Sequence, residues 1–499
     1  MAKPKAPRRR TKAARTDARL VAAQEVAQRA NAKLRELRAR YDAAQTHIDN
    51  RKHWGAADAL SANAANAPEI RRTLRNRARY EVSNNSYAQG IGLTLANDCI
   101  GTGPRLQVTS GDRSADSALE EIFSEWAEDI DLTGKLHTMR LAKYEDGETF
   151  AVMASNPRSE FPVQLDLQLV EAEQVANPFP TLEPNEADGI LFDRFGRALS
   201  YQLLAEHPGD RRSMTGFFSQ SSTIPARSML HYFLRLRPGQ MRGIPEITAA
   251  LPLFAQLRRY SLAVLAAAEV AADLALVIQS QFPPTDADEA DSIPEMSTWE
   301  LEKRMATVLP QGWSLGQAKP EQPTTTYAMA KREYLTEIAR CLNVPYNVAA
   351  CDSSSYNYAS GRLDHQVYNK AIRVERARIA RLVLNPLFRE FISEASLIEG
   401  LLPQAFRRRG PLPKHRWFWD GSEHVDPEKE ANAQGTRLEN NTTTLAEEYS
   451  SRGLDWEEQV RQRAKEVALM DELGLTPPAM EPAQPEPMVD DGDPDAEED

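Results

Sequence analysis

The chain has 499 residues, of which 41% are hydrophobic and 26% charged, and its net charge is −12 at pH 7. This is the composition of a soluble protein with room for several domains. The negative charge excludes a protein that wraps nucleic acid through bulk positive charge. The three cysteines show no CxxC spacing, which argues against a disulfide framework or a zinc site and favours a reducing cytoplasm. The N-terminus lacks the apolar stretch of a signal peptide, so we expect none.

Both ends of the chain carry blocks of like charge. Residues 1–40 are rich in Lys and Arg and predict a basic arm that is largely disordered or helical. All charged residues within 476–499 are acidic, which predicts a disordered acidic tail. The two blocks could simply keep the protein in solution. Alternatively, the basic arm could bind nucleic acid or a scaffold protein, and the acidic tail could bind a basic partner.

The first half of the chain predicts helices followed by strands. A polar cap before Tyr87 starts a helix that ends at Gly101, and a short strand follows. The next helix, within 112–132, is amphipathic, since Leu119, Phe123 and Trp126 recur at helical spacing. The stretches 148–156, 163–176 and 198–208 alternate or run apolar and predict a small β-rich region.

Helical patterns dominate the second half. A helix is expected from 245 to 279, where residues 260–278 are long and apolar enough to imitate a membrane span. Glu269 and Asp273 favour a closely packed soluble helix instead. Further helices are expected at 325–342, from Arg362 to about Ala395 with a kink at Pro386, and within 427–475. Together these elements predict an α+β fold that is mostly helical.

The stretch YNVAACDSSSYNYASGRLDHQ, from Tyr346 to Gln366, reads as a polar loop between two long helices. Such a long loop usually has a function, although a plain solvated connector is the alternative. No enzyme motif accompanies it, because GxxxxGK[ST], GxSxG and HExxH are all missing from the sequence. His365 beside Asp364 is typical of an ordinary helix residue, and the acidic stretch DADEAD lacks the glycine and final glutamate of a calcium loop. We therefore expect a non-enzymatic assembly protein without metal or cofactor.

Several blocks resemble one family in their order and spacing. They are YDAAQTHIDNRKHW, LRNRARYEVSNNSYAQG, NDCIGTGPRLQ, YEDGETF, IPARSMLHYFLRLRPGQMRGIPEI, DSSSYNYASGR and HVDPEKEANA. Over residues 40–470 the chain resembles the lambda-type portal proteins of tailed bacteriophages. The resemblance implies a ring of twelve copies at one capsid vertex, located in the virion and assembled in the host cytoplasm. Implied partners are double-stranded DNA, the terminase large subunit, major capsid and scaffold proteins and head–tail connector proteins, with no membrane.

The resemblance also implies the portal architecture of wing, stem, clip and crown. In chain order the expected regions are the wing at 41–244, the first stem helix at 245–279, the clip at 280–324, the second stem helix at 325–345, the tunnel loop at 346–361, a long kinked wing helix with a connector at 362–426, and the crown helices at 427–475.

The tunnel loop is expected to contact DNA inside the channel through Asp352, Ser353, Ser354, Ser355, Tyr356, Asn357, Tyr358 and Arg362. Serines can form weak, replaceable hydrogen bonds to phosphates, whereas arginines would grip them. The clip is expected to dock the terminase through Asp286, Asp288, Glu289 and Asp291. Arg373, Arg376, Arg378 and Arg381 could pair with neighbouring copies or face DNA. Two rival functions stay open: a non-portal DNA-binding assembly protein, and an enzyme of another kind.

Overall fold

A computed structural model describes residues 23–31, 52–178, 185–210, 220–273, 277–280, 313–316, 326–407, 412–421 and 427–475. The chain divides into two compact units, Met1–Ala64 and Ala65–Asp499. In the first unit, residues 23–31 are helical and residues 52–64 form turns, in which the Leu60 amide donates to the Asp58 carboxylate at 3.0 Å. The expected basic arm otherwise lies outside the described residues, as does the acidic tail.

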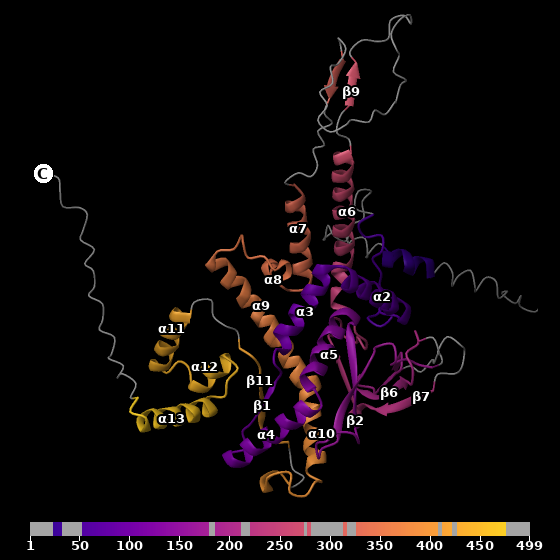
Figure 1. Cartoon of the computed structure of the whole chain (residues 1–499). Coiled ribbons are helices and arrows are strands. Elements are labelled where there is room, and N and C mark those ends of the chain that lie inside the picture. Colours follow the sequence, from indigo (N-terminus) through magenta and orange to yellow (C-terminus); the bar gives the residue numbers. More distant parts are fainter. Residues whose placement is uncertain are drawn as a thin grey trace, which may run out of the picture. The chain divides into compact units, whose positions relative to one another are not determined.

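Four helices open the second unit: α2 (Pro68–Asn84), α3 (Ser86–Ile100), α4 (Arg113–Asp129) and α5 (Leu132–Asp146) (Figure 1). Each start has a local cause. A proline begins α2, and the side chains of Asn85, Asp112 and Asp131 accept backbone N–H groups at the starts of α3, α4 and α5. As predicted, α3 ends at Gly101, and α4 buries Leu119, Phe123 and Trp126.

Two antiparallel sheets follow. The first has the order β3–β2–β8 (Leu165–Val170, Glu148–Ser155, Met229–Phe233), and the second has the order β4–β5–β6–β7 (Glu186–Ala187, Ile190–Phe192, Ala198–Leu204, Ser221–Pro225). In the central strand, Phe150 lies opposite Val170 on one side and opposite His231 on the other. Buried apolar residues of both sheets, including Phe150, Ile190 and Tyr201, form a small core of their own. A mostly helical α+β fold is thus confirmed.

The region expected as the first stem helix differs from its prediction. A 3₁₀ turn at Glu246–Ala250 precedes α6, which runs from Leu251 to Asp273, and residues Val277–Ser280 form strand β9 rather than helix. The β-branched Val277 and Ile278 pair with Gly316 and Leu315 of β10 (Trp313–Gly316), so strand pairing replaces the last helical turn. Within the described residues, no helix is long and apolar enough to cross a membrane.

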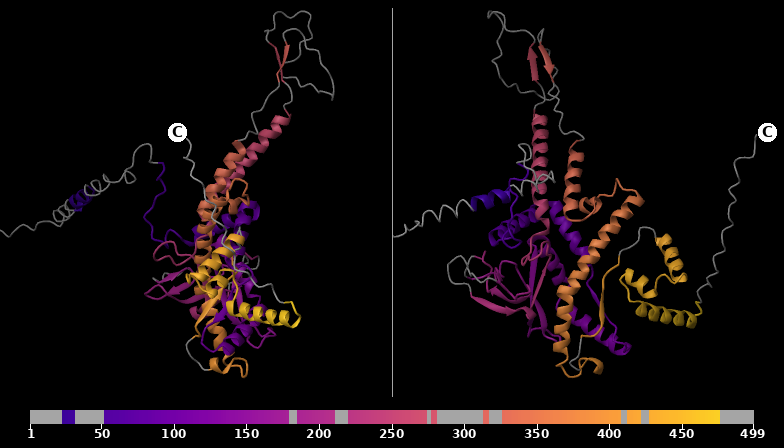
Figure 2. Two further views of the ribbon diagram at one scale, coloured as in Figure 1. Left: turned by 90° about the vertical axis from the view of Figure 1, so that its left-hand side faces the viewer. Right: turned by 180° about the vertical axis from the view of Figure 1, so that it is seen from behind.

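The helix predicted at 325–342 is present as α7 (Thr326–Cys341), which packs against α6 (Figures 1 and 2). The rings of Tyr260 and Tyr327 stack with centroids 5.8 Å apart, and the hydroxyls of Ser261 and Tyr327 share a hydrogen bond at 3.0 Å. The two helices are thus joined by specific side-chain contacts as well as by burial.

The long third helix is interrupted near its proline. Helix α9 (Tyr358–Ile379) passes into a π turn (Ala380–Leu384) and then into α10 (Asn385–Ala395), with Pro386 in the first turn of α10. Proline has no N–H to donate and its ring crowds the carbonyl four residues earlier, which accounts for the widened turn. The start was predicted too late: Asn357 and Ser360 form a capping box that begins the helix at Tyr358 instead of Arg362.

The C-terminal part returns to the N-terminal helices. Strand β11 (His415–Phe418) pairs antiparallel with β1 (Arg105–Val108), and Trp417 lies against Phe123 and Phe388. A 3₁₀ turn at Gln404–Phe406 precedes this strand, and helices α11 (Pro427–Glu439), α12 (Leu445–Ser451) and α13 (Trp456–Glu472) follow it. The predicted helical region within 427–475 is therefore present.

Candidate functional site

The expected tunnel loop is shorter than the sequence suggested. Residues Tyr346–Ala350 form the short helix α8, and α9 begins at Tyr358, so only Cys351–Asn357 lack regular structure. Pro345 starts α8, and Cys351 ends it in the left-handed conformation. The eight expected contact residues are therefore spread over one tight turn and the first turn of α9, where they lie close together.

Hydrogen bonds fold this turn back on itself. The Ser354 amide donates to Oδ1 of Asp352 at 2.9 Å, and the Tyr356 amide donates to the Ser353 carbonyl at 3.1 Å. The Ser354 side chain and backbone, which both hydrogen-bond to the carboxylate, hold the pKa of Asp352 below its usual value. At neutral pH the exposed tip therefore carries one negative charge beside the exposed, neutral side chains of Ser353 and Ser354.

The sides of the turn are anchored to the rest of the fold. Arg332 of α7 donates to the Ser355 hydroxyl at 2.8 Å, and its guanidinium lies 4.9 Å from the ring centroid of Tyr346. Tyr356 is half-buried, and burial together with the Asp364 carboxylate raises its pKa. Arg362 is exposed in the first turns of α9. The freest polar side chain of the turn is thus that of Ser353, since the Ser354 hydroxyl is bonded to Asp352.

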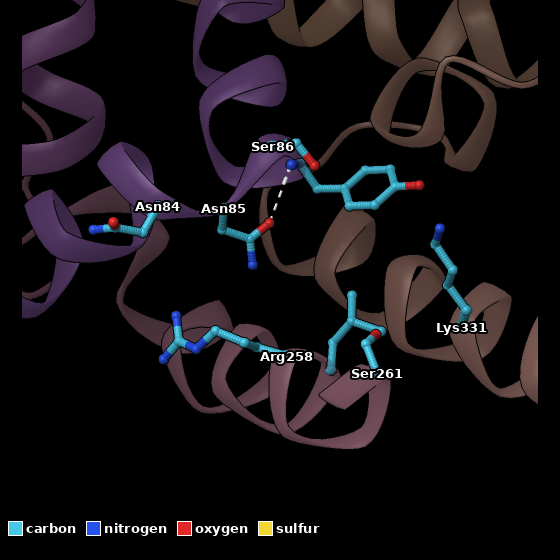
Figure 3. A pocket seen from close by; sticks show the side chains of 8 residues that line it. Asn84, Asn85, Ser86, Arg258, Ser261 and Lys331 are labelled. Atoms are coloured by element: carbon cyan, nitrogen blue, oxygen red, sulfur yellow. Dashed lines mark hydrogen bonds between the residues drawn. The ribbon is translucent and has the colours of Figure 1, made fainter. Parts of the chain in front are cut away.

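Two shallow pockets lie along the neighbouring helices, and the larger one reaches the turn at Asp352. One, of about 390 Å³, is lined by Tyr87, Ala328, Met329, Lys331, Arg332, Leu335, Tyr346, Ala350 and Asp352. The other, of about 260 Å³, lies at the α2–α3 junction and is lined by Asn84, Asn85, Ser86, Tyr87, Leu257, Arg258, Ser261 and Lys331 (Figure 3). Lys331 and Tyr87 belong to both linings.

Lys331 is a cation at neutral pH. Its ammonium lies 5.1 Å from the ring centroid of Tyr87, and the hydrogen bond to the Tyr87 hydroxyl raises its pKa. Beside the smaller pocket, Arg258 donates to Glu81 at 2.8 Å. The pockets therefore present the cations Arg258, Lys331 and Arg332 among aromatic and amide groups.

A buried ionic cluster, which the sequence analysis missed, lies around Glu148 of strand β2. Glu148 is fully enclosed and accepts hydrogen bonds from Arg242 at 2.9 Å, from Arg75 at 2.5 Å and from the Gly243 amide at 2.9 Å. Burial alone would raise its pKa, but the charge of Arg242 and the His231 hydrogen bond outweigh burial and hold that pKa well below its usual range. The cluster thus ties α2, strand β2 and the segment before α6 together.

A second cluster continues to α9. Lys143 of α5 contacts Glu246, at the start of the 3₁₀ turn, and reaches Glu375 of α9 at 2.8 Å. Arg140 donates to Glu246 at 2.9 Å. Although burial opposes ionisation, Arg140 and Lys143 lower the pKa of Glu246 to about 2. The signals for these clusters in the sequence were the charged residues within the blocks YEDGETF and RGIPEI, which the resemblance had singled out without giving them a role.

The four arginines of the third helix have different roles. Arg376 donates to the carbonyls of Asp98, Cys99 and Asp420 at 2.8–3.0 Å, and Arg378 pairs with Glu375. These two are therefore engaged within one copy, which corrects the expectation that they pair with neighbours or face DNA. Arg373 and Arg381 are exposed.

The expected clip residues Asp286, Asp288, Glu289 and Asp291 lie outside the described residues. In the part of the chain that the structure describes, one group of side chains has the spacing of metal ligands: Glu171, Glu173 and His207, whose ligand atoms lie within 4.8 Å of one another. Arg79 already lies 3.0 Å from Glu173 and 3.6 Å from Glu171. A cation would therefore have to displace a guanidinium.

Comparisons with known proteins point to one family. The family model described as phage portal protein, lambda family, matches residues 48–376. A probable portal protein of Halomonas phage phiHAP-1 is 26% identical over 470 residues, which cover 87% of each chain.

Similar solved structures have weaker matches. The neck of an empty GTA particle gives a TM-score of 0.43 at 13% identity, covering 78% of this chain and 94% of that one. An HK97 family phage portal protein from Corynebacterium diphtheriae gives a TM-score of 0.27 at 11% identity, covering 71% and 97%. Since both scores lie below 0.5, the family assignment rests on the sequence match.

Proposed function

The chain belongs to the lambda family of phage portal proteins, and from this premise we propose that twelve copies form a ring at one vertex of a phage capsid. DNA would enter and leave the capsid through the axial channel of this ring. The observation that carries the proposal is the family match over residues 48–376, which extends from before α2 through α7 and most of α9. The match thus includes every described element that the proposal uses for the channel.

Within the ring, we assign the turn from Asp352 to Tyr358, with Arg362, to the channel wall. Three features support this role. The tip is exposed, Ser353 presents a free neutral hydroxyl, and the charge within the turn itself is the negative charge of Asp352. Moving DNA requires contacts that form and break easily, and hydroxyls make such contacts with phosphates without releasing many counterions. The anchoring of Ser355 by Arg332 would keep the tip in place while DNA slides past.

We assign the docking of the packaging motor to residues 280–324, which lie between the two stem helices in the sequence. Their acidic side chains Asp286, Asp288, Glu289 and Asp291 would meet a basic surface of the terminase large subunit. The terminase would supply ATP hydrolysis, in line with the lack of a P-loop motif in this sequence. Capsid, scaffold and head–tail connector proteins would bind other faces of the ring during assembly in the host cytoplasm.

Electron microscopy of the purified full-length chain, combined with mass measurement of the particle, tests the proposal. A closed ring of twelve copies with an axial opening is the expected result. A chain that stays monomeric in every buffer and binds DNA through residues 1–40 would instead favour a non-portal DNA-binding assembly protein. Another ring size would leave the channel but refute the number of copies.

A further inference from the structure

We propose that the outward face of α9 is covered by a second copy of this chain; this inference rests on the proposed ring. The face carries a row of aliphatic side chains that one copy leaves in solvent. Leu363 is 64% exposed, Val367 is 60% exposed and Val374 is 54% exposed. Their spacing of four and then seven residues places all three on one side of the helix. Exposed apolar side chains that lie next to one another and are rimmed by polar ones are typical of an interaction surface.

The opposite side of α9 is already in use within the copy. Tyr368 donates to Asp98 at 2.5 Å, Arg376 donates to the end of α3, and Glu375 contacts Lys143 and the Tyr232 hydroxyl. These contacts fix how the helix is rotated about its axis. The aliphatic row therefore cannot turn inward, and none of the described residues of the same copy covers it.

Charge indicates what kind of molecule this is. Both acids of α9 are turned away from the exposed face: Glu375 is paired, and Asp364 is half-buried beside Tyr356. Apart from Arg362, which the proposed function places on the channel wall, the exposed residues of α9 include Lys370 and Arg373 and no acid, and among the described residues these two form no ion pair. The face is thus basic as well as apolar, whereas the whole chain carries a net charge of −12.

A second copy provides the acidic surface that this face requires. The exposed side of α4 presents Glu121, Glu125 and Glu128, and α7 presents Glu333 and Glu337 beside the exposed Met329. Two α9 faces could not pair with each other, because their basic side chains would repel one another. The contact must therefore join two different faces of neighbouring copies, which is the arrangement that closes rings.

Duplex DNA fits this face less well than a protein does. The DNA phosphates would attract the basic side chains of α9. The three aliphatic side chains, however, would then lie against phosphates and water and would gain little free energy from burial. A protein surface can satisfy both parts of the face at once, because interfaces combine apolar centres with charged rims.

Photo-cross-linking tests the proposal directly. A benzoylphenylalanine at Val367 is compared with one at Leu397, which is 71% exposed in the turn after α10. Irradiation of assembled, DNA-filled particles should give a ladder of chain multiples from position 367, at least tenfold stronger than from position 397. Cross-linking of position 367 to DNA alone, or no new band, would overturn the proposal.

Charge insertion provides an independent readout. Val367→Glu should reduce the ringed fraction at least tenfold at a subunit concentration where the unchanged chain is fully ringed, while Leu397→Glu leaves it unchanged. Circular dichroism and the thermal midpoint of the monomer should match in both variants, because both positions are exposed in one copy. Normal rings from Val367→Glu would refute the contact. An unchanged chain that forms no rings would refute the proposed function instead.

Discussion

Arg242 donates from Nε to the carboxylate of Glu148 at 2.9 Å, and both side chains are shut off from solvent. The same guanidinium donates to the carbonyls of Ala172 and Val175 at 3.0 Å. A single residue just before the 3₁₀ turn that leads into α6 thus holds the central strand and the loop after β3. Because Arg75 and His231 contact the same carboxylate, the stabilising free energy belongs to the whole cluster and cannot be assigned to the Arg242–Glu148 pair alone.

Removing the charge of Glu148 should destabilise the fold strongly. Glu148→Gln keeps the shape but leaves Arg75 and Arg242 buried without their counterion, and such a change costs about 3–5 kcal/mol. Glu121→Gln, on the exposed face of α4, should stay within about 0.5 kcal/mol of the unchanged chain. Urea unfolding of the monomer measures both variants. Equal midpoints for the two would mean that the cluster contributes nothing to stability.

Arg376 and Arg373 lie one turn apart on α9 and should behave differently. Arg376→Ala removes three hydrogen bonds to the carbonyls of Asp98, Cys99 and Asp420, and we expect a loss of roughly 2–4 kcal/mol. Arg373→Ala removes an exposed side chain and should leave the unfolding midpoint unchanged. If the monomer of Arg376→Ala unfolds like the unchanged chain, its guanidinium does not secure the end of α3.

The sequence predicted those elements whose pattern lies within a few residues. Helix α4 followed from the spacing of Leu119, Phe123 and Trp126, and strand β2 followed from its apolar run. Strand β11 was missed, because its four residues are stabilised by a partner strand that lies about 310 positions earlier in the chain. Long-range pairing leaves no local signal.

Charged residues misled the sequence analysis for a related reason. Glu148 and Arg242 are far apart in the sequence, and a charge in a strand usually points to solvent. Only the fold brings their opposite charges together in the interior. The two α9 arginines, Arg376 and Arg378, were likewise predicted to face outward, although carbonyls from α3 and a neighbouring glutamate already satisfy them.

Stability should depend on pH through Glu120. It accepts the Val108 amide at 2.6 Å, and burial together with nearby Asp455 raises its pKa to about 7. The folded state therefore holds this proton more tightly than the unfolded chain does, so its stabilising contribution is present below the unfolded pKa and lost as pH rises to about 7. Glu120→Gln should match the unchanged chain at pH 4.5 and exceed it in stability at pH 8. Parallel midpoints across this range would exclude the effect.

Gly147 should tolerate no side chain. It has φ +86°, and a Cβ there would overlap the backbone of Ile244 and Pro245. Gly196 is a matched control with φ +75° and open space around it. We expect Gly196→Ala to cost about 1–2 kcal/mol through backbone strain, and Gly147→Ala to lose a further 1–3 kcal/mol or more through overlap. Thermal unfolding of the two monomeric variants measures these losses of stability. Similar losses for Gly147→Ala and Gly196→Ala would mean that the backbone of Ile244 and Pro245 does not approach Gly147 closely.

The last prediction concerns the tip of the turn between α8 and α9. Ser353→Arg with Ser354→Arg adds two positive charges per copy while leaving Ser355 on Arg332, and Ser221→Arg with Ser222→Arg in the exposed strand β7 adds the same charge elsewhere. If the tip meets DNA, the first pair should strengthen DNA binding and steepen its dependence on salt, since each neutralised phosphate releases counterions. We expect both double variants to form normal rings. Only the variant at Ser353 and Ser354 should show DNA packaging that stalls at low salt and recovers as the salt concentration rises. Normal packaging at low salt by the variant at Ser353 and Ser354 would show that the tip does not contact DNA. Loss of rings in this variant would show that the tip is needed for assembly instead.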